Sequence, residues 1–369
     1  MDKAKLLVYG AGPLGSLFAA RLQAAGHEVT LLARGQRLEQ LRQHGLVLIN
    51  AENEEQTVTQ VQLVERLDPQ DAYDLVLVIM RKNKALEILP TLAANPHTPN
   101  VLFLMNNAAG PGELVAALGK ERVLCGFPSS GGMREGYAMR YLGGSAERVI
   151  PIPFGEVDGA ITGRTQWVAE ILGSMPGYSA EIMTDMDAWL KTHAALLMPS
   201  LVPALYACDT DNLRMARTRD ALVLAVRAIR EGFGVLHALG IPLLPASMRR
   251  LERLPEPVLV KMLQALLVRP QSKVAIVGHA LAAPDELQHL ADEFIALARS
   301  NAIPTPAIDR LYPYFDPGTP RLPDGSAEIP LDWRGIGPIL MLAGGVLSGL
   351  CLAGYLVFKR RQKNKATRM

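Results

Sequence analysis

The sequence predicts an α/β protein in which a doubly wound, Rossmann-type domain is followed by an all-helical domain and a C-terminal transmembrane helix. Three observations predict this. The first half alternates apolar strands and helices around a glycine-rich turn, the second half has only helical periodicity, and residues 336–358 carry no charge. A chain of 369 residues with 49% hydrophobic and 20% charged residues can form two cores of ordinary size.

The chain opens with an apolar strand, Leu6–Tyr9, which leads into a G-x-G-x-x-G turn and a helix. The first glycine of the turn permits a tight bend, the second leaves room for a pyrophosphate, and the third lets the helix pack on the strand. The turn consists of Gly10, Ala11, Gly12, Pro13, Leu14 and Gly15. Free N–H groups at the helix N-terminus suit phosphates, so we expect a dinucleotide site rather than a turn without a ligand.

The next predicted strand, Glu28–Leu32, is followed by Ala33 and Arg34. An acidic residue at the position of Arg34 would hold a ribose 2′-hydroxyl, whereas a cation suits a 2′-phosphate. The sequence therefore predicts NADP(H) rather than NAD(H) as the cofactor.

Further strands and helices complete the predicted Rossmann domain, which spans residues 1–183. Buried parallel strands are expected at Leu46–Ile49, Leu75–Met80, Val101–Leu104 and Val123–Phe127. Further strands are expected at Arg140–Leu142 and Val149–Phe154, and helices at Ala85–Leu92, Glu113–Leu118 and Gly159–Leu172.

Residues 184–315 are expected to form the helical domain, which would bind substrate and could form a homodimer. Apolar residues recur there every three or four positions, and prolines mark several helix starts. The predicted helices are Asp187–Tyr206, Asp220–Leu239, Pro245–Leu254, Pro257–Leu267, Pro284–Ser300 and Thr305–Tyr314. The polar cluster at 209–212 is expected to be a loop and helix cap.

A Pro/Gly-rich linker is predicted at 316–335, a transmembrane helix at 336–358 and a basic tail at 359–369. The 23 uncharged residues exceed the ~20 needed to cross the hydrocarbon core. Trp333 and Arg334 at one end, and Tyr355 with the basic cluster at the other, suit interfacial anchors. Gly345, Gly349 and Ala353 form a small-residue face on which two such helices could pack. The alternative is a buried core helix or an oligomer contact.

The net charge of +2 includes +6 from the last eleven residues, which leaves 2 − 6 = −4 for the rest. A mildly acidic body excludes a nucleic-acid binder, and no Cys/His spacing predicts a metal site. Three cysteines form no disulfide framework, and the apolar opening runs directly into the glycine turn, so we expect no signal peptide and cytoplasmic catalytic domains.

The basic tail conflicts with that location, because the positive-inside rule would place the tail in the cytoplasm and the catalytic domains outside. Either the folded domains override the rule, or the apolar segment enters the membrane and returns, which leaves the tail on anionic lipid. Both arrangements keep the catalytic domains cytoplasmic.

Lys191 lies near the start of the first long helix of the second domain, on an otherwise apolar face. Burial against a cofactor would lower its pKa toward neutral and make it a usable general acid. The alternative is a lysine that extends to the surface from the helix start.

Three sets of residues together resemble the ketopantoate reductase family: Gly10–Gly15 with Arg34, Asn106–Gly110 after the fifth strand, and Trp189–Lys191. The similarity covers roughly residues 3–315. It implies a Rossmann domain joined to a helical domain like that of 6-phosphogluconate dehydrogenase. It also implies hydride transfer from NADPH to a 2-oxo acid in the cleft between them, by default ketopantoate, which gives pantoate for pantothenate biosynthesis.

The resemblance implies roles for two residues in particular. Lys191 would be the general acid that protonates the carbonyl oxygen, and Asn107 would help to hold the nicotinamide end and the substrate. An amide at the carboxyl end of a strand also lies where doubly wound sheets bind ligands. The alternative for Asn107 is a cap for the helix that starts near Pro111.

Several positions depart from the family pattern. Arg81, with Lys82 beside it, stands where the family has a lysine after the fourth strand, and either cation could meet a phosphate. The two substrate-binding asparagines are replaced by Ala195 and Pro199, and the substrate-binding glutamate falls near Ser272 or Lys273. The remaining polar candidates for the substrate pocket are His193, Ser200, Lys273 and His279.

These departures leave three functions open. The first is an NADPH-dependent 2-oxo acid reductase, with ketopantoate as default substrate. The second is a related enzyme for a bulkier or more apolar carbonyl compound, since Ala195 and Pro199 replace amides. The third is a membrane-tethered NADPH-binding protein that reports redox state without catalysis.

Overall fold

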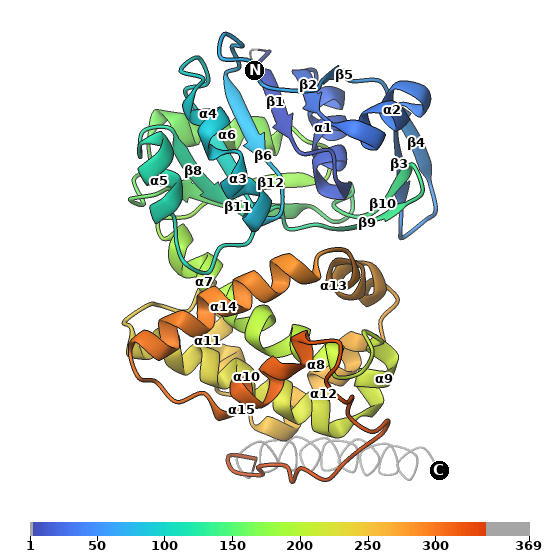
Figure 1. Cartoon of the computed structure of the whole chain (residues 1–369), viewed down its shortest axis with the longest axis vertical. Helices are drawn as coiled ribbons and strands as arrows, with labels where there is room; N and C mark the ends of the chain where they lie inside the picture. Colours follow the sequence, from blue (N-terminus) through green and yellow to red (C-terminus); the bar gives the residue numbers. More distant parts are fainter. Residues whose placement is uncertain (1–2, 337–369) are drawn as a thin grey trace, which may run out of the picture.

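The computed structural model describes residues 3–336, which form an α/β domain and a helical domain stacked along the long axis of the molecule (Figure 1). The predicted transmembrane helix, apart from its first residue, and the predicted basic tail lie outside the described residues. Within residues 3–336, no helix is both long and apolar enough to cross a bilayer.

An eight-stranded sheet forms the centre of the first domain, in the order β12-β11-β8-β7-β6-β1-β2-β5. Its strands are β1 (Lys5–Tyr9), β2 (Glu28–Leu32), β5 (Gln62–Val64), β6 (Leu75–Val78), β7 (Val101–Leu104), β8 (Val123–Gly126), β11 (Ile150–Glu156) and β12 (Tyr178–Ile182). All neighbours pair in parallel except β11 with β8. Because the strand order reverses at β1, a crevice opens at its carboxyl end, and the predicted Rossmann-like architecture is confirmed.

A second sheet has the order β4-β3-β10-β9 and packs against α1 (Pro13–Ala24). Its strands are β4 (Gln56–Thr59), β3 (Leu46–Asn50), β10 (Ala138–Leu142) and β9 (Gly131–Glu135). The prediction that Leu46–Ile49 belongs to the main parallel sheet is therefore wrong. The neighbour of β2 is the three-residue strand β5, which is too short to show in the sequence pattern.

The other helices of the first domain are α2 (Gly35–His44), α3 (Lys82–Glu87), α4 (Leu89–Ala93), α5 (Gly112–Leu118) and α6 (Gly163–Gly173). The single helix predicted at Ala85–Leu92 is divided at Ile88. Pro90 has no N–H to continue the first helix and occupies the first turn of the second, where proline is favoured.

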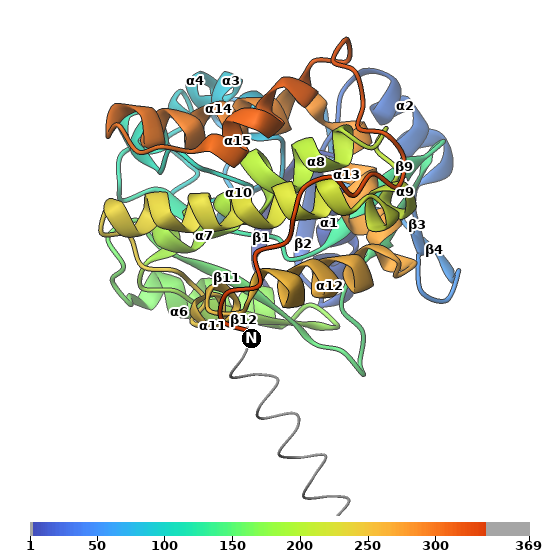
Figure 2. The same cartoon turned by 90° about the horizontal axis from the view of Figure 1, so that it is seen from below.

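The second domain is helical throughout, as predicted. Its α-helices are α7 (Met186–Leu196), α8 (Val202–Tyr206), α9 (Asn212–Arg217), α10 (Arg219–Ala238), α11 (Ser247–Glu252), α12 (Glu256–Leu267), α13 (Gly278–Ala282), α14 (Pro284–Ser300) and α15 (Pro306–Leu311). Two π-helical turns, η1 (Leu197–Leu201) and η2 (Lys273–Val277), and the 3₁₀ turn η3 (Tyr312–Phe315) complete it. The long helix α10 crosses the middle of this domain (Figure 2).

The π-helical turn η1 interrupts the helix predicted at Asp187–Tyr206. Pro199 cannot donate a backbone hydrogen bond to Ala195, and the Ser200 hydroxyl donates to the Ala195 and Leu196 carbonyls instead, at 3.2 and 2.7 Å. Ser200 therefore has a structural role. The predicted cap is present at Asp211, which accepts the first N–H groups of α9.

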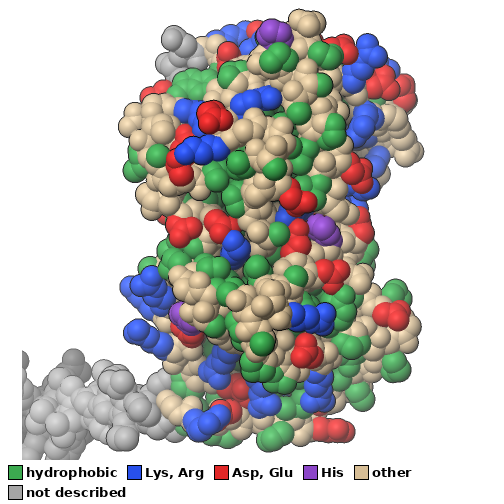
Figure 3. All heavy atoms as spheres, turned by 60° about the vertical axis from the view of Figure 1, so that its left-hand side comes forward, with side chains coloured by type: hydrophobic (Ala, Val, Ile, Leu, Met, Phe, Trp, Pro, Cys, Tyr) green, Lys and Arg blue, Asp and Glu red, His purple; other side chains and the backbone are tan. Residues whose placement is uncertain are grey.

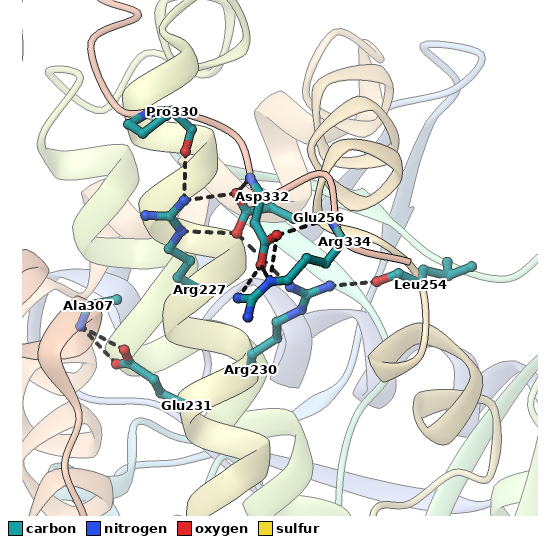
Figure 4. A network of polar contacts seen from close by, with 9 residues as sticks. All are labelled: Arg227, Arg230, Glu231, Leu254, Glu256, Ala307, Pro330, Asp332 and Arg334. Atoms are coloured by element: carbon teal, nitrogen blue, oxygen red, sulfur yellow. Dashed lines mark hydrogen bonds and ion pairs between the residues drawn. The ribbon is translucent and has the colours of Figure 1, made fainter. Parts of the chain in front are cut away.

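Residues 316–335, predicted as a linker, lie against the helical domain, and we call them the strap. Asp220 accepts the backbone N–H of Ile329 at 2.8 Å, and Arg227 donates to the Pro330 carbonyl at 2.7 Å. Glu256, itself paired with Arg227, accepts the Asp332 N–H at 2.9 Å (Figure 4). The residues predicted as a linker are thus bound to the helical domain, because buried acidic side chains far away in the sequence accept their backbone N–H groups.

Candidate active site

A cleft of 960 Å³ lies between the two domains, at the carboxyl ends of β1, β6, β7 and β8. The first domain contributes the glycine-rich turn and the residues that follow these strands. The helical domain contributes His193, Leu197, Ala275, His279, Ala282, Ala283 and Glu286. Acidic side chains gather along the waist of the molecule between the domains (Figure 3).

The glycine turn has the geometry that a pyrophosphate needs. Gly10 has φ +122°, and a Cβ there would lie 2.4 Å from the Ile79 carbonyl oxygen. A Cβ on Gly15 would lie 1.8 Å from the Gly10 carbonyl oxygen, so this glycine permits the close packing of α1. A Cβ on Gly12 would meet nothing within 4 Å, and no side chain caps α1, so its first N–H groups face the cleft.

Arg37 holds this turn in place, which the sequence did not predict. Its guanidinium donates to the Ala11 carbonyl (3.1 Å), the Ser16 hydroxyl (3.2 Å) and the Tyr137 carbonyl (2.7 Å), and so joins the turn to the second sheet. Burial, together with the nearby Arg134, lowers the pKa of Arg37 to about 10, which leaves it charged at neutral pH. A single arginine in a helix carries no motif that would reveal this role.

The cleft is electropositive. Arg34 is exposed at the N-terminus of α2, one strand away from the glycine turn. Among the described residues, six cations and one carboxylate, Glu286, line the cleft; the cations are Arg34, Arg37, Arg81, Lys84, Arg134 and Arg148. Such an excess of positive charge suits the phosphates of a dinucleotide, so the residues present fit NADP(H).

Lys82, rather than Arg81, is the cation that points into the junction between the domains. Its side chain is 1% exposed, donates to Asn107 Oδ1 at 2.8 Å and forms an ion pair with Glu293 of α14. Arg81 is 40% exposed and pairs with Asp285 at 2.9 Å. Both were predicted as phosphate-binding alternatives, and in the structure each is held by a carboxylate of the helical domain.

Two carboxylates at this junction were missed. Glu293 also accepts the backbone N–H groups of Ala108 and Ala109 at 3.3 and 3.2 Å, and Glu286 accepts the Lys82 N–H at 2.9 Å. We expected the family's glutamate near Ser272 or Lys273, yet Ser272 donates to the Leu266 carbonyl. The only sequence signal for these two residues was their spacing of seven positions, which places Glu286 and Glu293 on one face of α14. Most exposed helices have acidic residues at such a spacing.

Asn106 and Asn107 have different environments. The amide of Asn107 closes its own loop, since it donates to the Gly110 carbonyl and accepts the Gly110 N–H, both at 2.9 Å. Asn106 lines the cleft, is 8% exposed, and its Oδ1 has no hydrogen-bond partner within residues 3–336. A buried acceptor left unpaired costs about 1–3 kcal/mol, so this atom is suited to a ligand that donates a hydrogen bond.

Lys191 lies on α7 with 8% of its surface exposed and forms an ion pair with Asp187, one turn earlier. Its Nζ lies close to the Asn107 loop, because a Cβ on Gly110 would be only 3.3 Å away. Lys191 therefore lies beside the loop that carries Asn107. It does not line the cleft directly, and its partner in the structure is a carboxylate.

The helical wall of the cleft differs from the prediction. Ala195 packs against α10, since a Cβ built on Gly232 would lie 3.1 Å from the Ala195 Cβ. Pro199 is buried, and neither Ala195 nor Pro199 lines the cleft. His193 and Leu197 line it instead. The His193 ring lies 4.3 Å from Phe127, and burial, together with His279, lowers the pKa of His193 to about 4, so it is neutral at pH 7.

Comparisons with known proteins agree with this geometry. Residues 6–151 match the family model of ketopantoate reductase PanE/ApbA. A 2-dehydropantoate 2-reductase from Archaeoglobus fulgidus is 27% identical over 238 residues, which cover 64% of this chain and 75% of the relative.

Two solved structures show the same fold over most of the chain. A PanE/ApbA family ketopantoate reductase from Ralstonia eutropha JMP134 has a TM-score of 0.65 at 21% identity and covers 84% of this chain and 97% of its own. D-mandelate dehydrogenase, in a ternary structure with NADH and anilino(oxo)acetate, has a TM-score of 0.67 at 16% identity and covers 84% and 96%.

Fold, cleft and homologues define an NADP-dependent oxidoreductase, with NADP(H) as its cofactor. Within that class, residues 6–151 are similar to the ketopantoate reductase family, as are the curated relatives named 2-dehydropantoate 2-reductase, while the solved structures show the shared fold.

Proposed function

We propose that this protein reduces a 2-oxo acid with NADPH, with ketopantoate, which gives pantoate, as the default substrate. The observation that carries the proposal is the open glycine turn at the uncapped start of α1, with Arg34 at the adjacent strand end. In this proposal the turn from Gly10 to Gly15 binds the pyrophosphate and Arg34 binds the 2′-phosphate. Arg81, at the rim of the cleft, binds a phosphate of the same cofactor.

Bound NADPH supplies the hydride, and residues of this chain supply position and the proton. Asn106, whose buried Oδ1 needs a donor, holds the carboxamide of the nicotinamide. Asn107 and Lys82 fix the loop that carries Asn106. In this proposal Lys191, which lies beside the Asn107 loop and outside the cleft lining, turns from Asp187 toward the cleft and donates its proton to the substrate carbonyl oxygen. Asp187 then stabilises the ammonium form that must be restored before the next turnover.

The test is NADPH oxidation by the full chain with ketopantoate, beside Lys191→Ala. General acid catalysis is worth about 10²–10⁴-fold, so a loss of that size is expected. Lys120→Ala is the matched control, because Lys120 also pairs with an aspartate, Asp158, but on the exposed surface. Unchanged turnover in Lys191→Ala would contradict the proposed role.

A second candidate is a 2-oxo acid with a larger apolar side chain. Its support is the helical wall, in which Leu197 and three alanines accompany the aromatic pair of Phe127 and His193. D-mandelate dehydrogenase, which shares the fold, is a protein whose name refers to an aromatic hydroxy acid. A substrate panel in which ketopantoate gives the highest kcat/KM would exclude this candidate.

We also propose the domain limits 1–183 and 184–315, and a membrane anchor at 336–358 with the catalytic domains in the cytoplasm, which supplies NADPH. The support for the anchor is the uncharged length of this segment. Dimerisation through the helical domain or the small-residue face of the anchor remains part of the proposal. Cross-linking of the full chain in vesicles tests it.

A further inference from the structure

Large hydrophobic side chains gather on the part of the helical domain where the described chain ends. Ten such side chains are well exposed among the described residues, and five of them belong to α9, to α12 and the residue that follows it, and to the strap. We call these five the apolar face: Leu213 (53% exposed), Met262 (48%), Leu266 (41%), Val268 (54%) and Trp333 (60%).

Contacts between α9 and α12 bring Leu213 near the end of α12, and Met262 and Trp333 line one groove. The Asn212 side chain donates to the Leu267 carbonyl at 2.7 Å, which fixes the start of α9 against the end of α12. A groove of 630 Å³ runs between α9, α12 and the strap, and Trp333 and Ile336 line it. The chain therefore reaches its last described residue within this surface, and the uncharged segment continues from there.

Cations border the apolar face. Arg217, Arg219 and Lys261 line the groove. Arg217 is neutralised by Asp324 at 2.7 Å, whereas Lys261 donates to the neutral amide of Gln264 at 3.0 Å and Arg219 donates to the Ala327 carbonyl. Two of the three cations thus keep their net charge beside exposed hydrophobic side chains, a combination that suits anionic lipid headgroups above acyl chains.

We propose that the apolar face lies on an anionic membrane surface, so that the helical domain rests on the bilayer instead of hanging from a flexible tether. Ile336, the last described residue, lies in the groove at this face, and the 23 uncharged residues of the proposed anchor begin there. The strap makes the attachment rigid, because its backbone is bound to Asp220. Arg227 and Glu256 also bind it (Figure 4). This inference rests on the proposed membrane anchor and is independent of the proposed substrate.

The test uses the full chain with Cys351→Ser, reconstituted in phosphatidylcholine vesicles with and without phosphatidylserine. A Met262→Cys variant carries a fluorescent label, and Ile161→Cys carries the same label at an exposed apolar position of the first domain (61% exposed). Lipids with a spin label below the headgroup quench a probe that enters the interface. Strong quenching at 262, little at 161 and an increase with phosphatidylserine are expected.

A Lys261→Gln change in the labelled chain should reduce the docked fraction. One cation near an anionic surface is worth about 1 kcal/mol, which is about fivefold in the docking equilibrium. Equal quenching at 262 and 161 in vesicle-bound protein would overturn the inference and leave the anchor intact. Protein that does not stay with vesicles would overturn both, and a concentration-dependent change at 262 in lipid-free micelles would assign the face to a second copy of the chain instead.

Discussion

The buried ion pair between Lys82 and Glu293 joins the two domains, and its two partners should respond differently to removal. Glu293→Leu leaves the Lys82 ammonium, 1% exposed, with Asn107 Oδ1 as its remaining partner. An uncompensated buried charge costs about 3–5 kcal/mol, so Glu293→Leu should lower the free energy of unfolding by that amount.

Lys82→Met should cost less, about 1–3 kcal/mol, because Glu293 keeps other donors. These are the backbone N–H groups of Ala108 and Ala109. The double variant Lys82→Met/Glu293→Leu should be more stable than Glu293→Leu alone, since it removes both charges.

Urea unfolding of the full chain, followed by circular dichroism, measures these differences. Lys120→Met is the control, because its ion pair with Asp158 is exposed and such pairs are worth about 0–1 kcal/mol. The reasoning is refuted if Lys82→Met destabilises the protein more than Glu293→Leu, or if Glu293→Leu unfolds at the wild-type urea concentration.

Three further predictions concern the cleft. Gly15→Ala should destabilise the fold, because its Cβ would lie 1.8 Å from the Gly10 carbonyl oxygen. Gly12→Ala places its Cβ in free space, so the melting temperature should stay unchanged. The same variant should weaken NADPH binding about tenfold, as measured by calorimetry. Arg34→Glu should lower NADPH affinity by about 10–100-fold, the value of one charge-assisted contact, and leave NADH affinity nearly unchanged; equal losses for both cofactors would contradict a 2′-phosphate contact. The pKa of His193 is lowered from 6.5 to about 4, so the unfolded chain binds more protons than the folded chain between these pH values. The stability that neutral His193 contributes is complete above pH 6.5 and is lost as the pH falls toward 4. His193→Gln should therefore reduce the slope of the free energy of unfolding against pH in urea titrations.

The sequence predicted the features that depend on neighbours in the chain. The strand, turn and helix around Gly10–Gly15, and the long helices α10 and α14, follow from local spacing alone. Leu46–Ile49 was assigned to the wrong sheet, because an apolar run specifies burial and not a partner strand. Arg81 and Lys82 could not be separated, since the side chain that points inward depends on where α3 begins.

Features that depend on distant residues were not predictable. Glu293 meets Lys82 across 211 positions of the sequence, and the orphaned Oδ1 of Asn106 is visible only in three dimensions. The strap was predicted as a linker because proline and glycine were its main local signal. Its backbone is bound by Asp220 and Glu256, whose acidic side chains gave no sign of that role in their own helices.

The bound strap also restricts how far the catalytic cleft can move relative to the end of the strap. Twenty free residues of this kind would span about 25 Å on average and would let the protein rotate in any direction, since a flexible chain extends roughly 5–6 Å times the square root of its length. Residues 316–335 do not provide that slack, because contacts from Leu322 to Asp332 tie them to the helical domain. The distance and the orientation of the cleft opening relative to Ile336, the last described residue, are therefore fixed. Substrates would approach the cleft from one direction relative to that residue.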